Sequence, residues 1–102
     1  MSKRFLATYD IRRLPPASHT AFLASAERRG WFHWIADSAG IKYRLPNTTL
    51  DGWFDSYPQA WAAFRDSALE AQRLAGPGFV IEKWIIAEQS DTHFDSDVKR
   101  AA

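Results

Sequence analysis

Residues 4–11 alternate between apolar and polar side chains, which is the spacing of a β-strand that buries one face. After a pair of prolines, residues 17–29 place apolar side chains at helical spacing. A glycine follows them where a left-handed C-terminal cap belongs. We therefore predict a strand over 4–11 and a helix over 17–29, with Ser18 as its N-cap and Gly30 at its end.

The segment 31–54 is rich in aromatic residues and is broken by turns. Residues 31–37 have the composition of a strand, with aromatic side chains on both sides of the pleat. Residues 41–45 either lengthen a hairpin or form a loop before the break at Pro46. Residues 48–54 predict the next strand, so the whole segment is expected to be an extended hairpin.

A second helix is predicted after Ser56, which forms a capping-box pair with Gln59. The Gly-Pro-Gly sequence at 76–78 stops this helix and turns the chain. Apolar residues recur in it at steps of three and four, which predicts one continuous buried face. This expected face consists of Tyr57, Trp61, Phe64, Ala68, Ala71 and Ala75.

Residues 79–88 predict the last strand, and they are apolar on both sides of the pleat. Phe79, Ile81 and Ile85 are expected on one side, with Trp84 among the residues on the other. A sheet covered by helices on one face should alternate apolar and polar residues instead. We therefore expect the second sheet face to be buried in a symmetric homodimer.

The order of these segments is β-α-β-β-α-β, the split plan of ferredoxin-like α+β proteins. We expect a four-stranded antiparallel sheet with two helices on one face. Residues 1–88 form a single domain in this prediction, and residues 89–102 form a polar C-terminal tail. As an alternative, the segment Thr92–Phe94 of this tail adds a short edge strand.

Composition narrows the classes of protein to consider. The chain has no cysteine, which excludes disulfides and thiolate metal sites. No apolar stretch reaches the length of a membrane span or a signal peptide, so we expect a cytoplasmic protein with no membrane partner. Residues 1–51 carry a net charge of +4 and residues 52–102 a net charge of −3. This asymmetry permits a basic face without predicting a strongly basic nucleic-acid binder.

Asp10 ends the first predicted strand, just before Arg12 and Arg13. A carboxylate at this place either holds a metal or activates a water near a phosphate, or it only turns the chain. Arg28 and Arg29, at the end of the first helix, are either phosphate contacts or solvated charges that suit a helix C-terminus.

Lys42 and Arg44 are interleaved with apolar residues, and Trp34 is expected opposite them. Aromatic platforms flanked by cations bind single-stranded nucleic acid by stacking and charge neutralisation. The alternative is an edge hairpin that uses its charges to discourage aggregation. His33 is expected to be a partly buried structural histidine, and His19 a helix-surface residue. The sequence identifies no cofactor and no set of metal ligands.

Two short sets of residues resemble known families. Tyr9-Asp10-Ile11, followed by arginines, resembles the first strand of the CRISPR-associated acquisition proteins, which are small ferredoxin-like dimers. The segment from Gly30 through the Asp37–Gly40 turn to 45–49 resembles the GhoS-type antitoxin endoribonucleases. These resemblances imply an RNA-directed nuclease or antitoxin, and the first of them implies Asp10 as its acidic residue.

The leading hypothesis is a homodimeric, nucleic-acid-acting protein whose partner is single-stranded RNA and which is an endoribonuclease or an antitoxin. Asp10 would orient water or metal in it, and the basic residues would contact phosphate. One rival is a non-enzymatic module that binds a protein partner through its aromatic surface. A second rival is a dimeric α+β barrel that holds a small apolar ligand in a pocket. The residues expected to line that pocket are Trp31, His33, Trp53 and Trp84.

Overall fold

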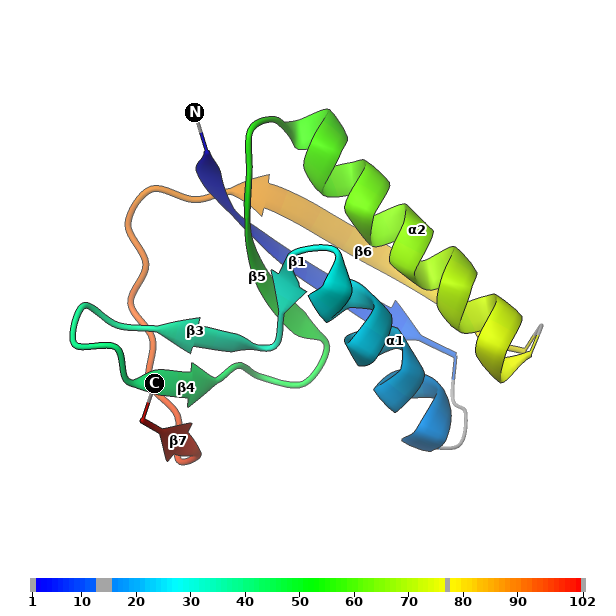
Figure 1. The fold of residues 1–102 in the computed structure, drawn as a ribbon, viewed down its shortest axis with the longest axis horizontal. Helices are drawn as coiled ribbons and strands as arrows, with labels where there is room; N and C mark the ends of the chain where they lie inside the picture. The colour runs from blue at the N-terminus through cyan, green and yellow to red at the C-terminus, as the bar shows by residue number, and fades with distance from the viewer. Residues whose placement is uncertain (1, 13–15, 77, 102) are drawn as a thin grey trace.

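The structure is a computed structural model that describes residues 2–12, 16–76 and 78–101. It contains two helices and two antiparallel sheets, which confirms the predicted α+β class (Figure 1). No helix in these ranges is long and apolar enough to span a bilayer. The elements in chain order are β1 (Lys3–Ile11), α1 (Pro16–Arg28), β2 (Trp31–Phe32), β3 (Trp34–Ala36), β4 (Lys42–Arg44), β5 (Thr49–Phe54), α2 (Tyr57–Ala75), β6 (Ile81–Glu88) and β7 (Lys99–Arg100).

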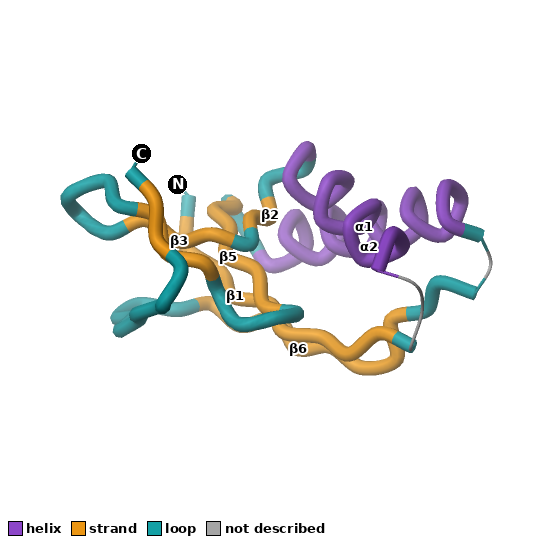
Figure 2. Tube along the Cα trace, turned by 90° about the horizontal axis from the view of Figure 1, so that it is seen from below, coloured by secondary structure: helices purple, strands orange, loops and turns teal. Residues whose placement is uncertain are grey.

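The first sheet has four strands in the order β2-β5-β1-β6, and all its pairings are antiparallel. Both helices lie on the same side of this sheet (Figure 2). The hydrophobic core fills the space between the sheet and the helices, where Phe5 and Tyr9 of β1 pack in one cluster with Phe22 of α1 and Phe64 of α2. Large aromatic side chains each remove about 150–250 Å² from water, so a few of them supply much of the burial in a chain of this size.

The helix ends agree with the sequence in most respects. Gly30 has a φ of +98°, the left-handed conformation that its place after α1 requires. Ser56 caps α2, since its Oγ accepts a hydrogen bond from Gln59 N at 3.4 Å. Ser18, however, is not an N-cap. Because α1 already begins at Pro16, Ser18 lies inside the first helical turn, where it is buried.

The buried face of α2 is rotated from the predicted one. Ala60, Phe64, Ser67 and Ala71 are its buried residues, whereas Tyr57 is 46% exposed. The rotation brings the backbone of α2 against the indole of Trp31, whose Nε1 donates to the Ala60 carbonyl at 3.1 Å. A small residue at this position therefore lets the helix approach the buried tryptophan closely.

Residues 31–37 do not form one strand as predicted, because the chain bends at His33. Trp31 lies in β2 of the first sheet and is fully buried against the helices. Ile35 lies in β3 of a separate, second sheet and is also buried. In a straight strand Trp31 and Ile35 would lie on the same face, because they are four residues apart and side chains alternate between the two faces. The bend separates them, and each is buried in a different place.

The second sheet has three strands in the order β3-β4-β7. Residues 41–45 were predicted either to lengthen a hairpin or to form a loop. They contain β4, the middle strand of this sheet. Its buried residues Ile35 and Leu45 line, together with Leu6 and Thr49 of the first sheet, a cavity of about 460 Å³. Part of the sheet face that the helices leave open is therefore covered by the chain itself, and that part needs no partner subunit to cover it.

The C-terminal tail supplies the third strand of the second sheet. Gln89 N donates to the Arg4 carbonyl at 2.9 Å, and Arg44 N donates to the Val98 carbonyl at 2.9 Å. The strand pairing in the tail falls at β7 and not at the expected segment 92–94. The tail therefore runs from the first sheet to the second and pairs with both.

The last strand contains a β-bulge that the sequence pattern does not reveal. Asp10 pairs with Lys83 whereas Ile11 pairs with Ile81, so Glu82 is an extra residue. Ile81 therefore packs on the core side, whereas Ile85, opposite Thr8, lies on the other face. The prediction that Ile81 and Ile85 share a side is wrong, because an inserted residue reverses the alternation beyond it.

Candidate nucleic-acid interface

One face of the second sheet carries a tryptophan and three cationic side chains. Trp34 pairs with Arg44, and Lys42 lies between Ala36 and Arg100 in the register. Directly paired residues of antiparallel strands share a face, as do residues two apart along one strand. We call the surface formed by Trp34, Lys42, Arg44 and Arg100 the basic face. In this surface Trp34 lies opposite the basic strand, as predicted from the sequence.

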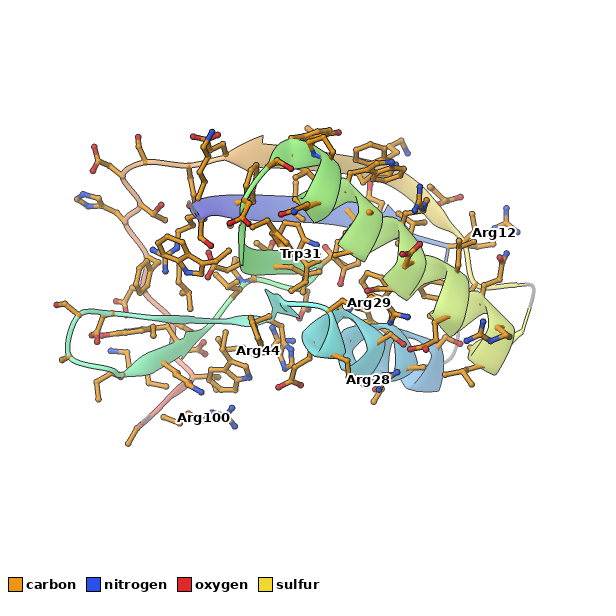
Figure 3. All side chains as sticks on the ribbon, turned by 45° about the horizontal axis from the view of Figure 1, so that its top comes forward. Arg12, Arg28, Arg29, Trp31, Arg44 and Arg100 are labelled. Carbon is orange, nitrogen blue, oxygen red and sulfur yellow. The ribbon has the colours of Figure 1, made fainter. Side chains whose placement is uncertain are left out.

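Two of the three cations of the basic face, Arg44 and Arg100, are held close to aromatic and backbone groups. The Arg100 guanidinium carbon lies 4.4 Å from the centroid of the Trp34 ring, a cation–π contact. Arg44 Nη1 donates to the main-chain carbonyls of His33 and Leu45 at 3.1 and 3.2 Å. Figure 3 shows Arg44 and Arg100 on the side of the molecule where the second sheet lies. The guanidinium groups of Arg44 and Arg100 are thus held in place by contacts within and beside the second sheet.

A groove of about 250 Å³ separates the basic face from the edge of the first sheet. Its second wall is formed by Arg4, Phe32 and Trp53, on the sheet face that points away from the helices. The Arg4 guanidinium carbon lies 5.0 Å from the Trp53 ring centroid. Trp53 is 56% exposed and Phe32 is 42% exposed. Each wall of the groove therefore offers an arginine–tryptophan pair.

Asp51 lies in the same groove and is almost completely buried. Its Oδ1 accepts a hydrogen bond from Gln89 Nε2 at 3.0 Å and lies 3.2 Å from Arg4 Nε. That contact with Arg4 is an ion pair without hydrogen-bond geometry. Burial raises the pKa of Asp51, although the Arg4 charge and the Gln89 hydrogen bond oppose the rise.

Two histidines lie near Arg44. His19 Nε2 is 2.8 Å from Tyr9 Oη, within hydrogen-bonding distance, so His19 belongs to the helix–sheet contact and not to the open helix surface. Burial, assisted by the Arg44 charge, lowers the pKa of both His19 and His33. The lowered pKa favours the neutral form of both imidazoles, so Lys42, Arg44 and Arg100 are the cations of this region.

The acidic candidate lies far from the groove. Asp10 is exposed and pairs with Lys83 near the end of β1, whereas Arg4 stands near its beginning on the same face. Asp10 is six positions further along the strand than Arg4, which is roughly 20 Å. Among the residues that the structure describes, no cluster of carboxylates or histidines is arranged to hold a metal.

The predicted phosphate contacts do not form one patch. Arg28 and Arg29 both bind Glu70 of α2 on the helix side, Arg29 Nη1 at 3.1 Å from Glu70 Oε1. Arg12 is exposed and lies at the opposite end of the molecule from Arg44 and Arg100 (Figure 3). Arg13 lies outside the described residues. Lys42 and Arg44 alone of the described candidates belong to the basic face.

Arg100, Arg4 and Asp51 were not among the residues predicted from the sequence, and Trp53 was expected only as part of the alternative ligand pocket. Arg100 was assigned to a polar tail, and no local pattern in that tail predicts that it pairs with β4. Arg4, Asp51 and Trp53 share the open face of the first sheet because they pair or alternate across β1 and β5. Strand alternation alone could have placed them together once the pairing of these strands was known.

The four residues of the proposed ligand pocket are not brought together. Trp31 is fully buried on the helix side, and Trp53 is exposed on the opposite sheet face. Trp84 stacks on Trp61 of α2, with ring centroids 4.4 Å apart. His33 stands at the bend between the two sheets.

No protein-family model matches this sequence, and comparison with curated proteins and with solved structures finds no match. The resemblances to acquisition proteins and to antitoxin endoribonucleases therefore stay predictions. A function is therefore proposed from the geometry of the groove and the basic face alone.

Proposed function

We propose that this protein binds single-stranded nucleic acid along the groove and the basic face. The observation that carries the proposal is the pair of arginine–tryptophan contacts, Arg100 with Trp34 and Arg4 with Trp53, on the two walls of one groove. Tryptophan rings accept any base by stacking, and the neighbouring cations neutralise phosphates. Lys42 adds a further cation to the same groove.

The shape of the groove favours an extended strand over a small ligand. Pockets that enclose drug-sized molecules have volumes of about 300–1,000 Å³ and cover most of the ligand. This groove, at about 250 Å³, is smaller and is bordered by exposed aromatic rings. A single unstacked base fits such a site while the adjoining backbone runs over Lys42, Arg44 and Arg100.

We further propose that the first sheet and its two helices form a ferredoxin-like unit, to which the second sheet is an addition. The strand order β2-β5-β1-β6 and the position of both helices on one side support this proposal. The bend at His33 is then the point at which the chain leaves the ferredoxin-like unit.

Binding is tested by fluorescence anisotropy with a labelled single strand of roughly ten nucleotides, as RNA and as DNA. We expect the affinity to fall steeply between about 50 and 200 mM salt, because binding releases counterions from phosphates. Trp53→Ala should weaken binding by about 5- to 150-fold, the equivalent of about 1–3 kcal/mol of stacking. Arg100→Ala should weaken binding and should reduce the slope of log affinity against log salt concentration, the salt slope, by about one.

The matched control is Arg65→Ala, which removes one exposed positive charge from α2, outside the groove. It should change neither the affinity nor the salt slope appreciably. No salt-dependent binding to RNA or DNA would end this proposal and leave the protein-interaction module as its rival. Cleavage is a separate prediction: if the protein is an endoribonuclease acting through Asp10, Asp10→Asn should bind RNA normally and fail to cut it.

A further inference from the structure

Two carboxylates line the groove, the exposed Glu27 of α1 and the buried Asp51, and charge neutralisation of phosphate requires neither. Asp51 is 5% exposed overall and yet lines the groove, so the little surface it retains opens there. A negative charge among phosphate-binding cations weakens the attraction for a polyanion. The presence of Asp51 in the groove therefore needs another explanation.

The position of Asp51 relative to the aromatic rings gives that explanation. In the register of the first sheet Asp51 pairs with Phe32 on β2 and lies two residues before Trp53 on β5, on the same face. Its side chain therefore stands between the two aromatic rings of this wall. A base stacked on Trp53 would therefore lie beside the Asp51 carboxylate.

The carboxylate is also held in place for such a contact. Gln89 Nε2 and Arg4 Nε both approach Oδ1, whereas Oδ2 takes part in none of the hydrogen bonds between described residues. An ionised carboxylate only accepts hydrogen bonds, so it selects a base edge that donates them. Of the four RNA bases, guanine alone presents two adjacent donors, N1–H and the 2-amino group, on one edge.

We propose that Asp51 makes the groove selective for guanine, an inference that rests on the proposed binding of single-stranded nucleic acid. The N1–H and 2-amino groups of guanine donate to the Asp51 carboxylate while the ring stacks on Trp53. Adenine places its N1 acceptor against the carboxylate and is rejected. Arg4 and Gln89 are positioning residues, because they hold the carboxylate.

The energetics of Asp51 agree with a binding role. Its raised pKa means that the folded state binds a proton more tightly than the unfolded state does, so stability increases as the pH falls toward that pKa. At neutral pH the ionised form of Asp51 therefore lowers the stability of the fold relative to the protonated form. Residues that oppose stability in this way are common at functional sites.

The test compares oligouridine strands that carry one central guanine, inosine or adenine, with anisotropy as the readout. Inosine lacks the 2-amino group and keeps N1–H, so it removes one of the two donors. We expect wild-type protein to bind the guanine strand about tenfold more tightly than the adenine strand, the scale of a bidentate base contact. Inosine should be intermediate.

Asp51→Asn should abolish this preference and still bind all three strands with a steep salt dependence, because the cations remain. Since this variant alters a buried group, circular dichroism checks its fold, and the inosine comparison tests the proposal on unaltered protein. Equal affinity of wild type for all three strands would overturn guanine selection and leave the proposed function standing. Absence of binding to any strand would overturn both.

Discussion

Glu70 shows how one side chain can join two helices. Its carboxylate, on α2, contacts Arg28 and Arg29 of α1, and it accepts a hydrogen bond from Ser25 Oγ. Hydrogen bonds from Arg29 and Ser25 are the main causes that lower the pKa of Glu70 to about 2. Arg28 and Arg29 are thus partners in a helix–helix contact, whereas their sequence suggested either phosphate contacts or solvated charges at a helix end; a contact with phosphate stays a prediction.

The depressed pKa predicts how acid affects the fold. A carboxylate with a folded-state pKa of about 2 contributes stability above its ordinary value of 4.5, and this contribution disappears as the pH falls from 4.5 to about 2. Glu70→Gln should lower the urea midpoint at pH 7 and should flatten the loss of stability in that acid window. Urea denaturation of both proteins at a series of pH values measures this.

Glu88→Gln is the control for this experiment, because Glu88 forms an exposed ion pair with Lys3, at 3.8 Å. Such pairs contribute little to stability. An acid dependence that is the same in wild type and Glu70→Gln would show that the helix contact does not depend on the charge of Glu70.

Among the elements, the tail differs most from its expected behaviour. A polar terminus contributes little burial in general, and residues 89–102 were expected to be no more than such a polar tail. In the structure, Phe94 contacts Tyr43 edge-to-face at 5.2 Å, Gln89 binds Asp51, and Arg100 covers Trp34. The tail is therefore part of both walls of the candidate site.

Ending the chain at Asp97 removes β7 and tests this role. We expect a small loss of stability, because β7 is short and exposed, and a large loss of affinity for single-stranded nucleic acid. Thermal melting and anisotropy measure the two effects separately. Lys99→Ala provides a matched control, since Lys99 pairs with Tyr43 on the other face of the second sheet. Unchanged affinity after the truncation would show that β7 is not part of the binding site.

Local patterns predicted the elements better than their arrangement. The periodicity of residues 4–11 and the cap at Ser56 depend on near neighbours in sequence, and both are confirmed. The bend at His33 and the bulge at Glu82 depend on which surfaces meet in the folded chain. The basic face was predicted only as far as Trp34, Lys42 and Arg44, because its remaining cation arrives from more than fifty residues away.

For the molecule as a whole, assembly stays a prediction. A homodimer was predicted because the second face of the first sheet needed to be buried. The second sheet covers part of that face. On β6, Ile85 remains 65% exposed and Trp84 40% exposed. These exposed side chains make β6 a candidate surface for an interface between two copies, away from the groove.

Sedimentation velocity at micromolar concentration tests this prediction. We expect a dimer, and Ile85→Lys should convert it to a monomer that binds nucleic acid with unchanged affinity, because Ile85 is not a residue of the groove. Ile85→Val is the control that keeps the surface apolar. A wild-type protein that sediments as a monomer would remove β6 as an interface.

The bulge in β6 also bears on how the protein avoids aggregation. β6 forms an edge of the first sheet, and an edge strand with regular spacing is a template onto which further chains can add without limit. The extra residue Glu82 interrupts that spacing beside the charged Lys83. An incoming strand would lose hydrogen bonds at the interruption and bury a charge beside it. We therefore expect the irregularity to oppose the addition of further strands at this edge.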